Sequence, residues 1–370
     1  MDEIAFLEEL VSIPSPSGAE EAAVEWLMAR MAELGFHTCR DMAGNGIGAL
    51  GPPDGTPTIL LLGHIDTVKG WIPVRREEGW LHGRGAVDAK GPLAAFVLAA
   101  ARAAPRLGRA RVVVVGAVEE EYRSKGAHYL VKTMPPPDYV LIGEPSGWDG
   151  ITLGYKGSLT VEYRRVQPVG HTAGAGELPA QAAVAFWNRL VEYTREVNRR
   201  QAASRGAVLP PRFDTLDPSL RAIRTFGDGL REGVEMHIGL RLPPRIDVEA
   251  LMQRMQTWAD GAQLTFPYAE PPFQAEKNTP LVRALLRAIR AEGGRPRFKR
   301  KTGTSDMNVV GPVWGSPIAA YGPGDSSLDH TPEERLSLEE FQRSIQVLSR
   351  VLEDLATRPL PHPPYPPQPS

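Results

Sequence analysis

The sequence contains a single cysteine, Cys39, among its 370 residues. One cysteine excludes an intramolecular disulfide framework, which is the usual support of small secreted domains. The same scarcity fits a protein that works in a reducing compartment.

Long apolar runs and a leader-like start are also missing. No apolar run approaches the roughly 20 residues that a membrane-spanning helix needs. Asp2 and Glu3 stand where a secretory leader would carry positive charge. We therefore expect a soluble, cytoplasmic protein with no membrane partner.

Neither sign of charge is in excess. The formal net charge is −2, because 42 Lys and Arg residues face 44 Asp and Glu residues. This balance gives no argument for nucleic acid or an acidic membrane surface as a partner. The short basic run Arg297–Lys301 does not alter that expectation.

The length of the chain and a change of pattern near residue 151 predict more than one domain. Before that point, short buried runs alternate with helical patterns, which predicts an α/β fold. After it, strands with one wet face follow a strand-helix-strand-strand-helix-strand order, which is typical of a small α+β unit. We predict a main domain from 1–150 and 271–358, an inserted domain at 151–270, and a disordered, proline-dense tail at 359–370.

Three apolar runs have the composition of strands buried on both faces, and each is followed at once by polar side chains. The runs lie at 58–63, 110–118 and 139–143, and the groups that follow are His64 with Asp66, Glu119–Glu121, and Glu144. Binding sites in open α/β sheets lie at the carboxyl ends of the strands. We therefore expect these side chains to meet.

Two loops add further candidates, Asp88 in the glycine-flanked segment 83–91 and His330 in the segment 329–334. Two histidines and three carboxylates can hold two divalent ions, with one carboxylate bridging and a position left for water or substrate. A spare carboxylate can then act as general base. Each motif alone has a simpler explanation, such as acids at a helix start, but their gathering at the ends of one sheet favours a metal site. The candidates are His64, Asp66, Asp88, Glu120, Glu121, Glu144 and His330.

Five ordered segments carry a family resemblance: GHIDTV, GRGAVDAKG, VEEEYRSKGA, IGEPS and DHTPEE. Together they resemble the motifs of the dinuclear zinc amidohydrolase/aminopeptidase family, which includes acetylornithine deacetylase, succinyl-diaminopimelate desuccinylase and the carboxypeptidase G type enzymes. The resemblance covers essentially the whole chain. It implies a zinc-exopeptidase-like mixed sheet with helices on both faces, and an inserted ferredoxin-like βαββαβ lid and dimerisation domain.

The same resemblance implies a role for each candidate side chain. Asp66 would orient His64, Glu120 would be the general base, and the peptide bond after Asp88 would be cis. Two divalent ions would be bound, Zn²⁺ in the first place with Co²⁺ as the alternative. Their implied ligands are His64, Glu144, the bridging Asp88, Glu121 and His330.

The inserted domain contributes implied substrate contacts and a subunit interface. His171 resembles the lid histidine that stabilises the oxyanion in a partner subunit's site, so a homodimer is expected. Arg241, with Gly303 and Thr304, resembles the contacts to the substrate carboxylate.

Within the family, the chain looks most like the branch that releases lysine or ornithine from an acidic amino-group carrier protein. The bond cut there joins the carrier's terminal Glu side chain to the α-amino group of the amino acid. The arginine-rich segment 189–212 is a candidate docking surface for such a partner. Two alternatives stay open, a small-molecule deacetylase or desuccinylase and a non-catalytic binding protein on the same scaffold.

Overall fold

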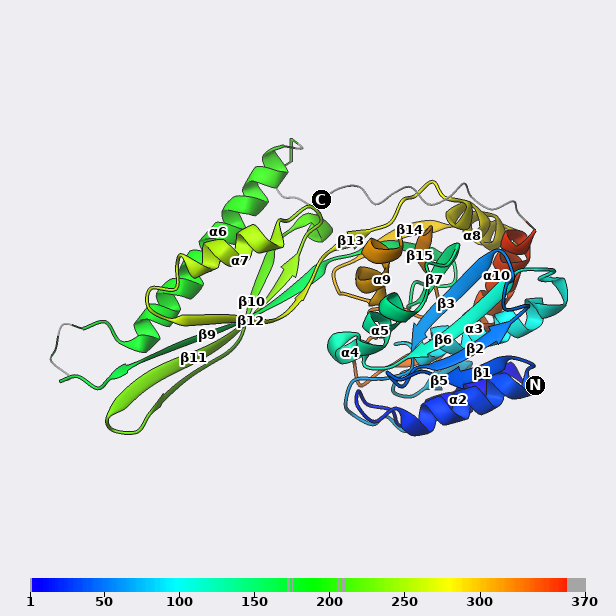
Figure 1. Cartoon of the computed structure of the whole chain (residues 1–370), viewed down its shortest axis with the longest axis horizontal. Helices are drawn as coiled ribbons and strands as arrows, with labels where there is room; N and C mark the ends of the chain where they lie inside the picture. The colour runs from blue at the N-terminus through cyan, green and yellow to red at the C-terminus, as the bar shows by residue number, and fades with distance from the viewer. Residues whose placement is uncertain (1, 172–173, 175, 205, 208–210, 358–370) are drawn as a thin grey trace. The chain divides into compact units, whose positions relative to one another are not determined.

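The computed structural model describes residues 2–357 except 172–173, 175, 205 and 208–210, so the predicted tail at 359–370 lies outside the described residues. The chain forms two compact units, which are both visible in Figure 1. The main unit consists of Met1–Gly154, Ala275–Arg300 and Ser305–Ser370, and the inserted unit consists of Tyr155–Gln274 with Lys301–Thr304.

The main unit is built on a nine-stranded mixed sheet. Its strands follow the order β1-β2-β6-β3-β7-β15-β8-β13, and β14 also pairs with β8. The central strands β6, β3, β7 and β15 are parallel, whereas β1, β2 and β8 pair in the antiparallel sense. The bounds are β1 His37–Arg40, β2 Gly46–Leu50, β3 Thr58–His64, β6 Arg111–Ala117, β7 Tyr139–Gly143, β8 Gly150–Tyr155, β13 Phe273–Gln274, β14 Arg297–Lys301 and β15 Ile318–Ala320.

Both faces of the central strands are covered. Successive side chains of a strand point to opposite faces, yet nearly every residue of β3, β6 and β7 is buried. Helix α3 packs on β3 and β6, and α2 packs on β1 and β2. The α/β fold with a mixed sheet and flanking helices, predicted from the sequence, is therefore confirmed.

The helices of the main unit follow the apolar patterns read in the sequence, with two additions. A short α4 begins directly at Glu120, and α9 contains Pro312; neither was predicted. The bounds are α1 Glu3–Val11, α2 Glu21–Glu33, α3 Lys90–Ala103, α4 Glu120–Arg123, α5 Lys125–Thr133, α8 Pro280–Ala291, α9 Asp306–Trp314 and α10 Leu338–Ala356.

A small three-stranded sheet brings two distant loops together. Strand β5 (Trp80–His82) pairs with β4 (Arg75–Glu77) on one side and with β16 (Arg335–Ser337) on the other. The segment 83–91 leaves β5, and the segment 325–334 leads into β16. The predicted Asp88 and His330 loops are therefore held at neighbouring positions.

The inserted unit is an antiparallel four-stranded sheet with two helices. Its elements are β9 Gly157–Pro168, α6 Pro179–Ala203, β10 Asp217–Gly227, β11 Arg231–Leu242, α7 Val248–Gln256 and β12 Gln263–Glu270. The spatial order is β10-β11-β9-β12. Alternate residues of β9 and β11 form an apolar core with α6 and α7, so the opposite face of these strands is polar. None of the described helices is long and apolar enough to cross a membrane.

Candidate metal and hydrolase site

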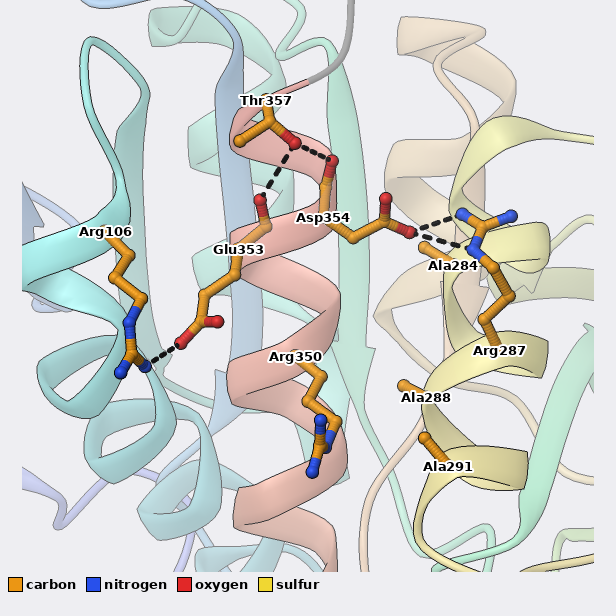
Figure 2. A pocket seen from close by; sticks show the side chains of 9 residues that line it. All are labelled: Arg106, Ala284, Arg287, Ala288, Ala291, Arg350, Glu353, Asp354 and Thr357. Carbon is orange, nitrogen blue, oxygen red and sulfur yellow. Dashed lines mark hydrogen bonds and ion pairs between the residues drawn. The ribbon is translucent and has the colours of Figure 1, made fainter.

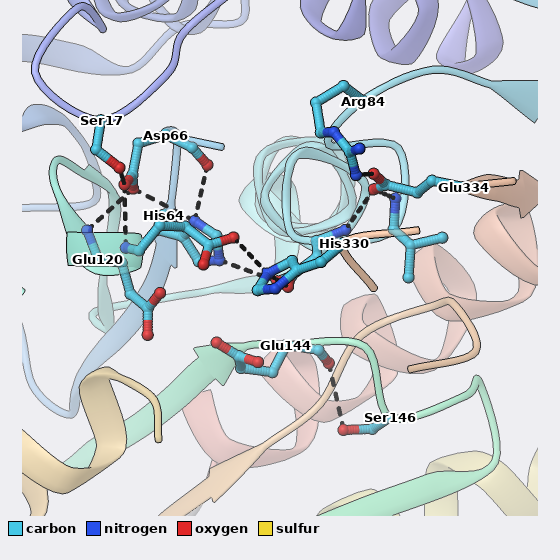
Figure 3. A network of polar contacts seen from close by, with 12 residues as sticks. Ser17, His64, Asp66, Arg84, Glu120, Glu144, Ser146, His330 and Glu334 are labelled. Atoms are coloured by element: carbon cyan, nitrogen blue, oxygen red, sulfur yellow. Dashed lines mark hydrogen bonds and ion pairs between the residues drawn. The ribbon is translucent and has the colours of Figure 1, made fainter. Parts of the chain in front are cut away.

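The structure brings the seven candidate side chains of the main unit into one polar cluster at the carboxyl ends of β3, β6 and β7 (Figure 3). The cluster includes the only group of three metal-ligating side chains found within the described part of the chain. Ligand atoms of His64, Asp88 and Glu121 lie within 4.8 Å of one another there.

Asp88 lies between the two histidines. Its Oδ1 is 3.2 Å from Nε2 of His64, and its Oδ2 is 3.0 Å from Nε2 of His330. The same nitrogen of His330 is 2.9 Å from Oε1 of Glu121. Each oxygen of Asp88 therefore faces a different imidazole, which is the geometry that a carboxylate bridging two ions requires. The peptide bond between Asp88 and Ala89 is cis, as the resemblance implied.

Asp66 is the organising carboxylate of the cluster. It is fully buried and accepts hydrogen bonds from the hydroxyl of Ser17 at 2.7 Å and from the backbone N–H groups of Glu120 and Glu121 at 3.0 Å each. Nδ1 of His64 is 3.0 Å from the main-chain oxygen of Asp66 and 3.4 Å from its Oδ1. Asp66 thus fixes both the ring of His64 and the turn that presents the two glutamates.

The backbone has an unusual conformation at two positions of the cluster, one in that turn and one in the His330 loop. Glu119 has φ of 56° and precedes α4, and His330 has φ of 62°. Residues other than glycine rarely adopt this left-handed region, so the surrounding contacts must hold Glu119 and His330 in it.

The carboxylates of the cluster shift the pKa values of its two imidazoles. Hydrogen bonds to Asp88 and Glu121 raise the pKa of His330 to about 10. Burial alone would lower the pKa of His64, but contacts with Asp66 and Asp88 raise it well above its ordinary value. Nearby carboxylates favour the protonated form of each ring, which accounts for both shifts. The donor set of imidazole and carboxylate groups is one that zinc and related divalent ions accept.

Glu120 and Glu144 complete the cluster. Both are largely shielded from solvent, and Figure 3 shows their carboxylates on one side of His64. Burial raises the pKa of Glu120, with further contributions from Glu144 and Asp306. A carboxyl with a raised pKa is a stronger proton acceptor than an ordinary one, which suits it to act as a general base.

The remaining predicted site residues belong to the inserted unit. His171 is exposed just after β9, and its carbonyl oxygen accepts a hydrogen bond from Gly174 N–H at 2.7 Å. Arg241 lies on β11, with Nη1 3.5 Å from the hydroxyl of Thr304, and Gly303 precedes Thr304 in the chain. The structure groups these four residues with the inserted unit, separately from the metal-site candidates.

Arg241 lines a polar hollow of about 140 Å³ on the helix-free face of the inserted sheet. Its other polar walls are Ser158, Thr160, Ser219, Arg221 and His237. Gly239 leaves the centre open, because an added Cβ would lie 3.1 Å from the Ser219 hydroxyl. Its two arginines, Arg221 and Arg241, bring positive charge to this hollow, which suits a carboxylate.

A larger hollow of about 450 Å³ lies between α8 and α10 (Figure 2). Its arginines are already paired with acids, since Arg106 contacts Glu353 at 2.8 Å and Arg287 contacts Asp354. Histidine is absent from its described lining. The hollow therefore lacks the imidazole ligands of the polar cluster, and no arginine of its described lining is left unpaired to bind an anion.

Glu334 is the functional candidate that sequence reasoning missed. Its side chain is 1% exposed and contacts the loop that carries Asp88. The one available signal was its position four residues after His330, at the end of the DHTPEE segment.

Comparison with known proteins places this fold and site in one family. A family model described as Peptidase family M20/M25/M40 matches residues 60–354. A LysW-lysine hydrolase of Deinococcus radiodurans is 47% identical, covering 94% of this chain and 95% of the relative. A relative from Thermococcus kodakarensis, with a LysW-lysine/LysW-ornithine hydrolase name, is 42% identical and covers 96% of this chain and 92% of its own length.

The solved structure of an M20 family metallo-carboxypeptidase, Sso-CP2 from Sulfolobus solfataricus, shares the fold. Its TM-score is 0.77 at 18% identity, with 96% of this chain and all of that chain covered. The family match spans most of the chain, and the relatives are similar over nearly their full lengths. The chain is therefore a member of peptidase family M20/M25/M40.

Proposed function

We propose that this protein is a metal-dependent amide hydrolase that releases lysine from an amino-group carrier protein in amino-acid biosynthesis. The bond cut joins the side-chain carboxyl of the carrier's terminal Glu to the α-amino group of lysine. Ornithine is the second product to test. The observation that carries the proposal is Asp88, whose two oxygens face His64 and His330, in a chain 47% identical to a LysW-lysine hydrolase.

Two divalent ions fit the cluster, with Zn²⁺ the first choice and Co²⁺ the alternative. Asp88 is positioned to bridge them, and His64, Glu121, Glu144 and His330 are the remaining ligand candidates. Several carboxylates gathered with only two imidazoles would repel one another strongly unless cations were present. The placement of Asp88, with one oxygen toward each imidazole, supports this assignment.

Glu120 and Asp66 have different roles in the proposed amide hydrolysis. When bound, the two ions would polarise the scissile carbonyl and make a water molecule more acidic. Glu120 takes a proton from the attacking water and delivers it to the leaving α-amino group. Asp66 holds His64 and the Glu120–Glu121 turn in register through hydrogen bonds of 3.0 Å each.

Substrate recognition is assigned to the inserted unit. We place the carboxylate of the substrate at Arg241 and Thr304, beside Gly303, because two arginines line the adjoining hollow. His171 is assigned to the oxyanion of the tetrahedral intermediate. An Arg241→Met variant should raise KM for the carrier-linked substrate, and an unchanged KM would remove Arg241 from this role.

Helix α6 is proposed as a docking surface for the acidic carrier. Four arginines lie on this helix against two glutamates. Arg199 contacts Glu192 at 2.7 Å, and Arg200 contacts Glu196. Positive charge therefore remains in excess, and it would speed encounter with an acidic partner.

The chain is further proposed to act as a homodimer that pairs along β10. This strand is an edge of the inserted sheet, and among the described strands it pairs only with β11. Its outer part exposes Leu220, Ile223 and Phe226 at 36–43%. An exposed edge with apolar side chains is a template for pairing with another chain, here a second copy. Sedimentation analysis of Ile223→Lys tests this, and an unchanged dimer would exclude the β10 edge.

The decisive experiment follows the released products by mass spectrometry. Metal-loaded enzyme is incubated with a carrier protein conjugated to lysine, beside N-acetyl-lysine, N-acetyl-ornithine and N-succinyl-diaminopimelate. Rapid release of lysine from the carrier, with slow hydrolysis of the small substrates, is the expected result. Fast hydrolysis of the small substrates alone would make the protein a small-molecule deacylase instead. Binding without any turnover would favour a non-catalytic role.

The docking surface is tested in the same assay. Reversing the charge of Arg199 and Arg200 to Glu should weaken turnover of the carrier-linked substrate, with little effect on N-acetyl-lysine. Equal losses on both substrates would exclude docking through α6.

A further inference from the structure

Glu334 forms a buried clamp on the loop that carries Asp88. Its Oε1 accepts hydrogen bonds from the backbone N–H groups of Val87 at 2.9 Å and Asp88 at 3.1 Å. Its main-chain oxygen accepts a longer hydrogen bond from Gly83 N–H at 3.3 Å. Glu334 therefore holds the loop at its first residue, Gly83, and again at its middle, next to Asp88.

The other carboxylate oxygen of Glu334 is held by an arginine. Nη1 of Arg84 donates to Oε2 at 2.7 Å, and the two side chains are 10% and 1% exposed. Nε of Arg84 donates to the main-chain oxygen of Gly70 at 3.0 Å. Because this ion pair is shielded from water and has its hydrogen bonds satisfied, removing one partner would leave an uncompensated buried charge.

Glu334 connects the loop that carries Asp88, the implied bridging ligand, with the loop that carries His330, a second implied ligand. Glu334 lies four residues after His330, and it contacts Asp88 through that residue's own backbone N–H. Figure 3 shows Arg84 and Glu334 next to His330, on the side of the cluster away from Asp66. Asp66 thus fixes the half of the site formed by His64 and the glutamates, and Glu334 fixes the half formed by Asp88 and His330.

We propose that Glu334, held by Arg84, is a positioning residue that sets the distance between Asp88 and His330 and so makes the site competent to bind its metal ions. The proposal rests on the proposed function, because it assigns Asp88 and His330 as metal ligands. Glu334 itself contacts neither ion nor substrate in this assignment. Groups that orient metal ligands typically contribute about 10–100-fold to metal affinity.

The test compares the metal affinity of metal-free protein variants, measured by competition with a chromophoric chelator for Zn²⁺. Glu334→Ala should weaken Zn²⁺ binding by about 10–100-fold. Glu333→Ala is the matched control, because Glu333 is the exposed neighbour in the same segment, and it should bind Zn²⁺ within about twofold of wild type. Absorption spectra of the Co²⁺-loaded proteins should differ from wild type for Glu334→Ala and match it for Glu333→Ala.

A second pair of variants separates positioning from general loss of folding. In Glu334→Gln, an amide N–H would face the guanidinium of Arg84, which also donates, so metal binding should again fall. Removing that conflict in the double variant Glu334→Gln/Arg84→Met should restore part of the affinity, because the Gln oxygen can still accept from Val87 and Asp88. A purely structural role predicts no such recovery.

The outcomes distinguish the clamp from the proposed function. Wild-type protein that binds no Zn²⁺ would overturn the metal-dependent function itself. Wild-type binding together with unchanged affinity and an unchanged Co²⁺ spectrum in Glu334→Ala would overturn the clamp alone. Weak binding in Glu334→Ala, without any recovery in the double variant, would also reject positioning through the backbone of the Asp88 loop.

Discussion

At the scale of single residues, the two adjacent glutamates after β6 have different surroundings although they share one turn. Glu121 contacts His330 at 2.9 Å, whereas the carboxylate of Glu120 lies near Glu144 and Asp306 and takes no part in that contact. Their backbone N–H groups bind the two different oxygens of Asp66. The turn therefore aims one glutamate at the proposed metal centre and leaves the other for proton transfer.

This division predicts the behaviour of Glu120→Gln. The variant should keep its fold and its metal content but lose about 10²–10⁴-fold in kcat, since only the proton acceptor is removed. The measurements are steady-state kinetics on carrier-linked lysine and metal content by mass spectrometry. A rate near that of wild type would move the general base to another residue, and a loss of metal would make Glu120 a ligand.

Asp306 predicts a pH dependence of stability in the metal-free protein. It is 3% exposed at the start of α9, and no described group bonds to its Oδ1. Burial raises its pKa from 3.8 to about 6, so the folded state holds this proton more tightly than the unfolded state. Stability from this group is therefore fully present below about pH 4 and is lost as the pH rises to about 6.

Replacing Asp306 with Asn removes that titration. At pH 7 the free energy of unfolding of Asp306→Asn should exceed that of wild type by about 1–3 kcal/mol, and the two should converge near pH 4. Urea unfolding of both proteins across this range is the measurement. A variant less stable than wild type at pH 7 would mean that the ionised carboxylate is needed in the fold.

Site residues could be predicted from the sequence where they stand at the end of a strand with a clear apolar pattern. His64, Asp66 and Glu144 come directly after buried strands, so their meeting followed from the sheet alone. Glu334 could not be found in this way, because its partners are backbone N–H groups of a loop nearly 250 residues earlier. A sequence pattern carries no signal for the path of such a loop.

At the scale of elements, α5 is anchored against β6 by a buried amide. Asn45 accepts a hydrogen bond from Val118 N–H at 3.0 Å and donates to the carbonyl oxygen of Gly126 at 3.2 Å. A Cβ at Gly126 would lie 2.3 Å from Oδ1 of Asn45 and 2.8 Å from the nitrogen of Val118. Glycine is therefore required where α5 crosses the end of β6, just after the Glu120–Glu121 turn.

Gly126→Ala should accordingly lower the free energy of unfolding by about 1–3 kcal/mol, although alanine favours helices elsewhere. Gly176→Ala is a suitable control, because no atom lies within 4 Å of its Cβ position and its φ lies outside the left-handed region that favours glycine. Thermal and urea unfolding of both variants measure the difference. A Gly126→Ala protein as stable as the control would mean that Asn45 moves aside at little cost.

Elements were predictable in proportion to their length and apolar content. The long buried strands and the amphipathic helices α8 and α10 carry strong periodic patterns. Strands β4, β5 and β16 have only three residues each, which is too short for an apolar alternation to be recognised, so they give no such pattern. That small sheet is nevertheless what brings the Asp88 and His330 loops together.

At the scale of the whole molecule, the proposed metal ligands connect chain segments that the inserted unit separates in sequence. His64, Asp88, Glu121 and Glu144 precede the inserted unit, whereas His330 follows it. Metal binding should therefore tie the two chain segments of the main unit together. The inserted unit has its own apolar core and contains none of these ligands.

This arrangement predicts that metal stabilises one unit selectively. Ions at about 1,000 times their Kd should stabilise the folded main unit by about 4 kcal/mol relative to metal-free protein. Hydrogen exchange should slow for backbone N–H groups of β3, β6 and β7 and stay unchanged in β9 and β11, because compact units with separate cores open independently. Equal slowing in both units would mean that they unfold as one cooperative body. Slowing confined to the inserted unit would place the ions outside the His64–Asp88–His330 cluster altogether.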